Sequence, residues 1–301
     1  MIIQPDMQRS EMVEVLSAKR PKLSPASART YASLLLTAIR KSGKPLDISD
    51  SKKTLDFFQN DSGLGMNALK TVLSALLVLT GDDAYKKAMM QKISKYNEIQ
   101  TAQRRTDREE KNWVTFDEIK EIFDDNRATF YAMAKQKKLP ISDKSNLQKF
   151  IIFIVSSGVF IPPRRSMDYT ELTWEKHDQG NYIDKGKFIF REYKTASTYG
   201  TQIVPIPKQL QTWLKLWRKH QPGKWVFTDT SGKKLSAAGY GQRVSSFFHG
   251  KDISTSMLRK IYLSEIYKDV PKLRYLQETA DAMGHSVDAA MSNYVKKNES
   301  D

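Results

Sequence analysis

Apolar residues recur at helical spacing through most of the first hundred positions. The first such segment starts at Ser24-Pro25 and ends at Gly43, with apolar positions at Tyr31, Leu34, Leu35 and Ile39. Proline is favoured at the first helical position and glycine just past the last, so these residues predict the helix boundaries. Further helical segments begin near residues 51, 66 and 83. Together the four segments predict a compact helical unit.

A charged segment follows this unit. Residues 100–111 read QTAQRRTDREEK and contain no apolar residue beyond Ala102. This composition is typical of an extended linker or of the exposed end of a helix. Thr115 followed by Glu118 then fits a capping box, which marks a helix start. We therefore expect a second domain from residue 111.

The second half of the chain mixes helical and strand patterns. A strongly apolar helix is expected over residues 145–159, and the turn Asp184-Lys185-Gly186 predicts a hairpin. Short strands are expected at 182–183, 187–193 and 201–205. Helical patterns return at 208–219, 240–248, 255–268 and 273–283. The expected fold class is therefore mainly α with a small antiparallel β-sheet.

The expected domain organisation has three parts. Residues 1–22 are polar and form either a partly ordered basic arm or a plain disordered terminus. Residues 23–110 form a helical domain with its linker, and residues 111–301 form the second domain. The length of 301 residues and the hydrophobic content of 40% are enough to build two cores.

The net charge of the chain indicates the kind of partner that it binds. The net charge is +15, from 49 lysines and arginines against 34 acidic residues, and the basic residues are spread along the chain. This favours an anionic partner, of which nucleic acid is the commonest. The alternative is a solvated basic surface that only aids solubility.

Composition also excludes several kinds of chemistry. The chain has no cysteine, which excludes disulfides, thiol nucleophiles and cysteine zinc sites. Its four histidines are far apart and show no metal-ligand spacing, which leaves carboxylates as the remaining metal ligands. No apolar run approaches the roughly 20 residues that span a bilayer, and no secretory leader is recognisable. We therefore expect an intracellular protein without membrane contact.

The C-terminal segment contains candidate chemistry. Gly284 is followed directly by His285, and Tyr294 lies nine positions later. A tyrosine hydroxyl is a poor nucleophile near neutral pH and needs nearby cations and a group that handles protons. Arg165 and Arg259 lie upstream, and Lys194 lies between them near the hairpin.

In chain order this set resembles the catalytic residues of the tyrosine recombinases, the phage-integrase family: Arg165, Lys194, Arg259, His285 and Tyr294. The resemblance covers residues 111–301. It implies cleavage and rejoining of double-stranded DNA through a 3′-phosphotyrosyl intermediate, with no metal or other cofactor. It also implies a helical core-binding, SAM-like domain over residues 23–110 and self-association to a tetramer on DNA.

The resemblance assigns a role to each residue. Arg165 and Arg259 would hold the non-bridging oxygens of the phosphate, Lys194 would protonate the leaving 5′ oxygen, and Tyr294 would be the nucleophile. His285 would donate to a non-bridging oxygen and assist the tyrosine. Asp168 at plus three and Trp174 at plus nine match Arg165 rather than Arg164, and Asp168 is expected to orient an arginine or cap a helix.

Two features depart from the family pattern. Ser256 occupies the place of a histidine, and Lys260 is a candidate for the missing cation. The serine suggests a divergent lineage, such as a virus or a eukaryotic mobile element. Only seven residues follow Tyr294, too few for the usual exchange of C-terminal helices between protomers.

Alternative functions stay open at the level of sequence. These are a type IB-like topoisomerase and a non-catalytic DNA-binding protein on the same fold. The sequence leaves open the DNA target, the direction of the reaction, the host, any accessory proteins, and whether cleavage occurs in cis or in trans.

Overall fold

The computed structural model describes residues 1–284, 286–289 and 291. The chain divides into two compact units. The helical unit contains residues 1–104 together with the described residues from Pro271 onward, and the mixed unit is Arg105–Val270. Among the described residues, no helix is long and apolar enough to cross a membrane. The described residues are mainly helical, with a two-stranded ribbon and a small four-stranded sheet, which confirms the expected mainly α fold class.

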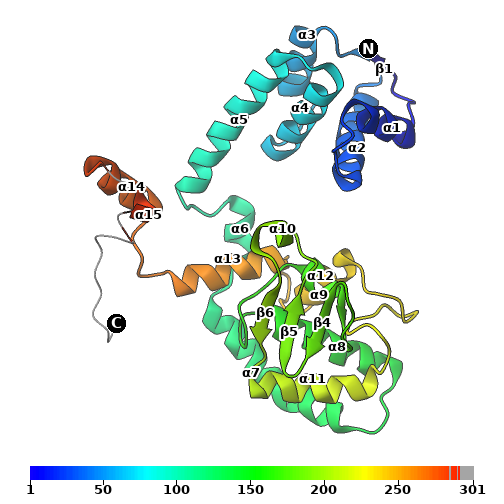
Figure 1. Cartoon of the computed structure of the whole chain (residues 1–301), viewed down its shortest axis with the longest axis vertical. Coiled ribbons are helices and arrows are strands. Elements are labelled where there is room, and N and C mark those ends of the chain that lie inside the picture. Colours follow the sequence, from blue (N-terminus) through cyan, green and yellow to red (C-terminus); the bar gives the residue numbers. More distant parts are fainter. Residues whose placement is uncertain (285, 290, 292–301) are drawn as a thin grey trace. The chain divides into compact units, whose positions relative to one another are not determined.

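The helical unit has a two-stranded ribbon beside its helices (Figure 1). Its elements are β1 (Ile2–Ile3), α1 (Arg9–Lys19), α2 (Pro25–Ser42), β2 (Leu46–Asp47), α3 (Ser51–Asp56), the π-helical turn η1 (Phe57–Asp61), α4 (Met66–Thr80), α5 (Asp83–Thr101), α14 (Leu273–Ala282) and α15 (Val287–Ala289). Ser24 caps α2 by accepting from the Ser27 amide, and Gly43 ends it with φ of 64°. Both boundaries agree with the sequence pattern.

The N-terminal segment differs from the expected arm. Residues 9–19 form α1, and Met12 and Leu16 are fully buried in the core of the helical unit. Arg40 also donates to the backbone oxygens of Pro5 and Met7, which ties the first residues to α2. Two apolar residues at i and i+4 are a weak pattern, so α1 depends on tertiary packing.

The mixed unit begins earlier than expected. Helix α6 (Asp107–Asn112) forms at the end of the charged segment, and Thr106 and Glu109 make a capping box at its start. The Asn112 side chain accepts from the Asp252 amide, and Lys251 donates to the Trp113 carbonyl. The mixed unit therefore begins at Arg105, within the charged segment, whereas residues 100–104 and the described residues from Pro271 onward group with the helical unit.

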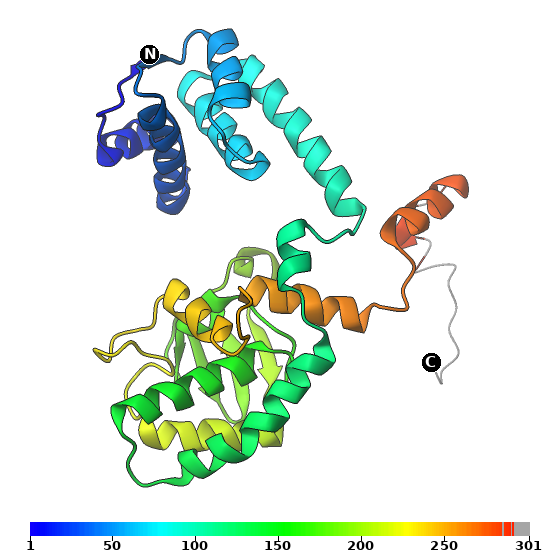
Figure 2. The same ribbon diagram turned by 180° about the vertical axis from the view of Figure 1, so that it is seen from behind.

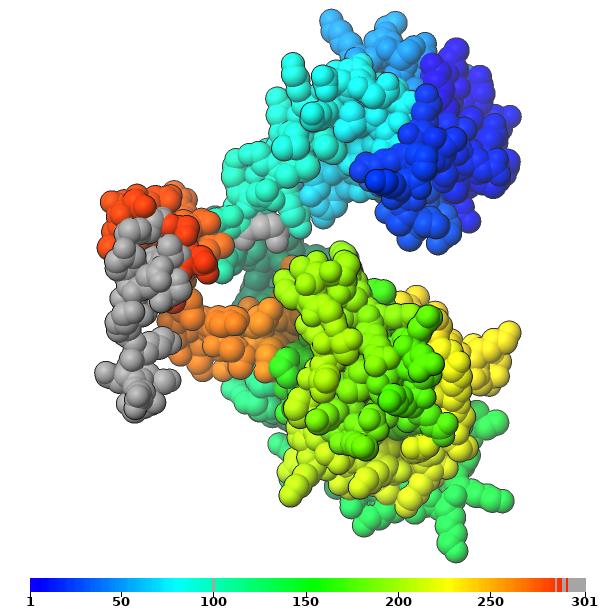
Figure 3. Space-filling view, viewed as in Figure 1, coloured from blue at the N-terminus to red at the C-terminus, as the bar shows by residue number. Residues whose placement is uncertain are grey.

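The mixed unit has a four-stranded sheet with helices packed on one face, as Figures 1 and 2 show from opposite sides. Its elements are α6 (Asp107–Asn112), α7 (Phe116–Lys135), α8 (Ile141–Ser156), α9 (Ser166–Thr170), β3 (Leu172–Thr173), β4 (Asn181–Asp184), β5 (Lys187–Phe190), α10 (Ala196–Tyr199), β6 (Gln202–Pro205), α11 (Lys208–His220), α12 (Ala237–Ser245) and α13 (Thr255–Ile266). In the space-filling view, the green segment that contains β4 and β5 forms much of the visible face of this unit (Figure 3).

The sheet order is β3-β4-β5-β6. The hairpin pairs Asp184 with Lys187, and its central residues Lys185 and Gly186 both have positive φ, as a type I′ turn requires. The antiparallel expectation is correct for β4, β5 and β6, but β3 pairs in parallel with β4. A two-residue strand is too short to show alternation, so periodicity could not identify β3.

The core of the mixed unit is rich in aromatic rings and centres on α8. Phe150 and Phe153 of this helix are fully buried. Phe188 and Phe190 of β5 project to one side of the sheet, because alternate strand residues share a face. Both contact the ring of Tyr169 in α9, with centroids 6.3 and 5.9 Å from it. This packing holds α9 rigidly against the sheet.

Candidate active site

Arg164 and Arg165 follow two prolines at the start of α9. Arg165 is the N-cap residue, with extended φ and ψ of −71° and 147°. Arg164 donates from Nε to Asp168 Oδ2 at 2.9 Å and from a terminal nitrogen to Gln202 Oε1 at 2.6 Å. Its guanidinium also lies 4.1 Å from the centroid of the Phe190 ring. The two adjacent arginines therefore differ, because only Arg164 is held by side-chain partners among the described residues.

Asp168 lies at the centre of this cluster and is 1% exposed. Its Oδ1 is buried and has no hydrogen-bond partner among the described residues. Burial raises the pKa of Asp168, and the positive charges of Arg164, Arg165 and Arg259 act in the opposite direction. Asp168 thus orients an arginine, but that arginine is Arg164.

Arg259 reaches the same cluster from α13. Ser254 caps this helix by accepting from the Met257 amide, and Arg259 lies in its second turn. Burial lowers the pKa of Arg259, and the nearby charge of Arg165 lowers it further. The fold therefore brings Arg165 and Arg259 together from distant parts of the chain. No hydrogen bond or ion pair engages either guanidinium among the described residues.

Such an arrangement suits an anion. Three guanidinium groups surround one carboxylate whose own ionisation is opposed by burial, so the cluster carries excess positive charge. Two like charges held close together destabilise each other unless an anion lies between them. Arginine matches a phosphate well because its planar fork can donate two parallel hydrogen bonds.

Lys194 lies in the connection between β5 and β6, as the sequence indicated. Its side chain is exposed, while Tyr193 beside it is 8% exposed. The Tyr193 hydroxyl donates to the Gly200 carbonyl at 2.7 Å, which closes the loop that contains α10. The backbone on either side of Lys194 is thus anchored, and its side chain remains open to a ligand.

Ser256 and Lys260 lie on the same helix as Arg259. Ser256 is exposed one turn before Arg259, where side chains at i and i+3 are neighbours. The Lys260 ammonium is paired with Glu109 of α6. In this arrangement Lys260 links α13 to the charged segment and does not supply a free cation beside Arg259.

His285 and Tyr294 lie outside the described residues, so their placement relative to the arginines is not described. Among the described residues, no group of three or more histidine, aspartate or glutamate side chains could hold a metal ion. Trp174, at plus nine from Arg165, is buried with the Arg218 guanidinium 5.6 Å from its ring centroid.

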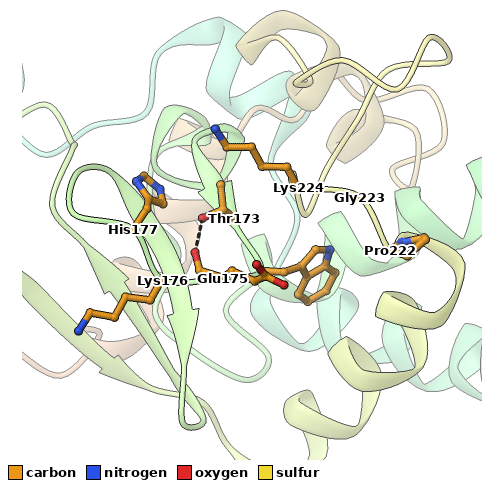
Figure 4. Close-up of a pocket in the computed structure, with 8 residues that line it drawn as sticks. Thr173, Glu175, Lys176, His177, Pro222, Gly223 and Lys224 are labelled. Atoms are coloured by element: carbon orange, nitrogen blue, oxygen red, sulfur yellow. Dashed lines mark hydrogen bonds between the residues drawn. The ribbon is translucent and has the colours of Figure 1, made fainter.

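A separate pocket follows β3 and has a volume of about 390 Å³. Residues 173–177 and 222–224 line it (Figure 4). The Thr173 hydroxyl donates to the Glu175 carbonyl at 3.0 Å within this wall. None of the residues expected for catalysis lines this pocket.

Sequence reasoning missed two side chains of this cluster, Asn181 and Gln202. Asn181 is fully buried, donates to the carbonyls of Asp168 and Glu192, and accepts from the amides of Arg191 and Glu192. Gln202 is the partner of Arg164. Neither belongs to a motif; an asparagine directly before the apolar residues Tyr182 and Ile183 was the one available signal.

Comparison with known proteins identifies no family. No family model matches the chain, and no curated protein matches it. The crystal structure of XerA recombinase is a structural neighbour with a TM-score of 0.36 and 12% sequence identity. The alignment covers 97% of this chain and 95% of that chain. A likeness this distant supports no functional conclusion by itself.

Proposed function

We propose that the chain is a tyrosine-type DNA strand transferase that acts as a site-specific recombinase. The observation that supports this most is that Arg165 and Arg259 meet beside buried Asp168, while neither guanidinium forms a hydrogen bond or ion pair with a described residue. The net charge of +15 favours the same anionic partner, double-stranded DNA. Action on DNA places the protein inside the cell, where we propose that it assembles as a tetramer on its target.

The proposed step is a phosphoryl transfer. The Tyr294 oxygen attacks the phosphorus and forms a phosphotyrosyl ester, while the bond from phosphorus to the 5′ oxygen breaks. The phenol proton passes to a nearby base or to water, and Lys194 gives a proton to the leaving oxygen. Arg165 and Arg259 neutralise the charge that develops on the non-bridging oxygens, and His285 donates to one of them.

Covalent capture tests this proposal directly. A pool of nicked duplexes with randomised sequence around the nick is incubated with the full chain, and adducts that survive detergent are isolated. The nick allows the short fragment that bears the released 5′ hydroxyl to diffuse away, so the covalent intermediate accumulates. We expect an adduct with the wild type, none with Tyr294→Phe, and a loss of about 10²–10³ in rate with Arg165→Ala.

Tyr275→Phe is the matched control, because Tyr275 is 62% exposed on α14 and has no assigned role. The catalytic proposal would be wrong if Tyr294→Phe retained the adduct of the wild type. Duplex binding without any wild-type adduct would instead favour the non-catalytic DNA-binding protein. Relaxation of plasmids that lack any captured target sequence would favour the topoisomerase.

A further inference from the structure

Arg164 connects three elements of the mixed unit around a single guanidinium. It pairs with Asp168 of α9, donates to Gln202 at the start of β6, and covers the Phe190 ring at the end of β5. Its guanidinium lies 5.1 Å from the centroid of the Tyr193 ring as well. The Arg164 side chain is 16% exposed, so these contacts are largely shielded from water.

The elements that Arg164 joins hold the two ends of the Lys194 loop. Phe190 and Tyr193 precede Lys194, and Gln202 begins the strand that follows the loop. On the other side of the guanidinium, Asp168 belongs to the helix that Arg165 caps. Arg164 therefore spans the distance between the backbone that bears Lys194 and the backbone that bears Arg165.

Asn181 reinforces this connection through the backbone. Its side-chain amide donates to the Asp168 carbonyl at 2.9 Å and to the Glu192 carbonyl at 2.8 Å. The loop end is thus tied to α9 by two independent contacts, one ionic and one from a buried amide. A long lysine side chain loses considerable rotamer freedom when it is positioned. A rigid backbone beneath it reduces the further conformational entropy that must be lost.

We propose that Arg164 is a positioning residue that holds Lys194 at the distance from Arg165 at which it can protonate the leaving oxygen. Arg164 does not contact the phosphate in this scheme, because its Nε and one terminal nitrogen already donate to Asp168 and Gln202. The inference rests on the proposed function and gives the two adjacent arginines different roles, with Arg165 at the phosphate and Arg164 as the positioning residue. A shift of about 1 Å in a catalytic group can lower a rate by about 10²-fold, so the positioning has a measurable effect.

A change of leaving group tests this proposal. When sulfur replaces the bridging 5′ oxygen, the product is a thiolate, which leaves without a proton because thiols are far more acidic than alcohols. We expect Arg164→Met to lower the rate of adduct formation about 10²-fold on the oxygen substrate and less than about threefold on the sulfur substrate. Lys194→Ala should show the same rescue, whereas Arg165→Ala should be slow on both substrates.

Two further variants separate positioning from loss of folding. Gln202→Ala removes one partner of Arg164 from a partly exposed strand position, and we expect a smaller defect with the same rescue. Arg191→Met is the matched control, because Arg191 donates to the Asp178 carbonyl on the same hairpin and contacts neither Asp168 nor Gln202. It should act as the wild type does on both substrates.

The outcomes distinguish this inference from the function on which it rests. Equal losses on the oxygen and sulfur substrates for folded Arg164→Met and Gln202→Ala, with an active wild type, would overturn the positioning role alone. A wild type that forms no adduct with either substrate would overturn the proposed function and this inference with it. Folding of each variant is checked by tryptophan fluorescence, because all five tryptophans lie in residues 105–270.

Discussion

Two adjacent arginines in this chain have different environments, and a buried carboxylate explains the difference. Arg164 forms an ion pair with Asp168, while Arg165 forms no ion pair with any of the described residues. A carboxylate that is 1% exposed is costly to ionise, and an ion pair offsets only part of that cost. For this reason burial outweighs the arginines, and the pKa of Asp168 is raised above its ordinary value of 3.8.

The raised pKa of Asp168 predicts a specific pH dependence. The folded state holds this proton more tightly than the unfolded chain does, so protonation contributes stability that is complete below a pH of 3.8. That contribution is lost as the pH rises through the folded-state pKa. The difference in unfolding free energy, wild type minus Asp168→Asn, should therefore fall as the pH increases.

Denaturant titrations followed by tryptophan fluorescence from acidic to neutral pH measure this difference. Subtracting the unfolding free energy of the variant removes the contribution of the carboxylates that both proteins share. Asp168→Asn keeps the side-chain shape and cannot ionise, which makes it the closest available variant. A difference that rises with pH would mean that the ion pair with Arg164 dominates over burial.

At the scale of elements, three helices meet at Gly158, which follows α8. Its φ is 94°, and a Cβ atom there would lie 2.6 Å from Cδ2 of Tyr262 in α13 and 3.1 Å from Cε2 of Phe116 in α7. The two rings form an edge-to-face pair with centroids 5.6 Å apart. This contact packs α13, which carries Arg259, against α7 and against Gly158 after α8.

Gly158→Ala should therefore destabilise the mixed unit on two counts. A left-handed backbone costs an alanine about 1–2 kcal/mol, and displacing packed rings adds about 1–3 kcal/mol. Gly250→Ala is the control for backbone strain alone, since Gly250 has φ of 70° and nothing within 4 Å of its Cβ position. Equal losses of unfolding free energy in the two variants would contradict the packing role of Gly158.

At the scale of the whole molecule, each unit has its own hydrophobic core. Leu73 of α4 belongs to the core of the helical unit, and Leu147 of α8 belongs to the core of the mixed unit. Both side chains are fully buried. Separate cores allow separate unfolding transitions, which a single probe of the whole chain would merge.

The same substitution in each core tests this independence. Leu73→Ala and Leu147→Ala should each cost about 2–5 kcal/mol, but only Leu147→Ala should shift the melting transition followed by tryptophan fluorescence. Circular dichroism at far-ultraviolet wavelengths reports both units and should record a shift for either variant. A shift of the tryptophan transition in Leu73→Ala would show that the two units unfold together.

Much of the fold could be predicted from local sequence because its causes are local. The capping box of Thr115 and Glu118 is present, with the Thr115 hydroxyl accepting from the Glu118 amide at 3.1 Å. The type I′ hairpin follows from Gly186, which adopts positive φ without strain. Helix α1 and strand β3 were missed because non-local packing stabilises them and their local patterns are weak.

The candidate site likewise combines features with local causes and features that depend on non-local packing. Residue type and spacing are local properties, so the sequence alone showed that Arg165, Lys194 and Arg259 are present and in which order they occur. The pairing of Arg164 with Asp168 and Gln202, and that of Lys260 with Glu109, could be identified only in the folded structure. Those choices depend on which distant side chains share a buried volume, and burial sets both the cost of a charge and the partner that offsets it.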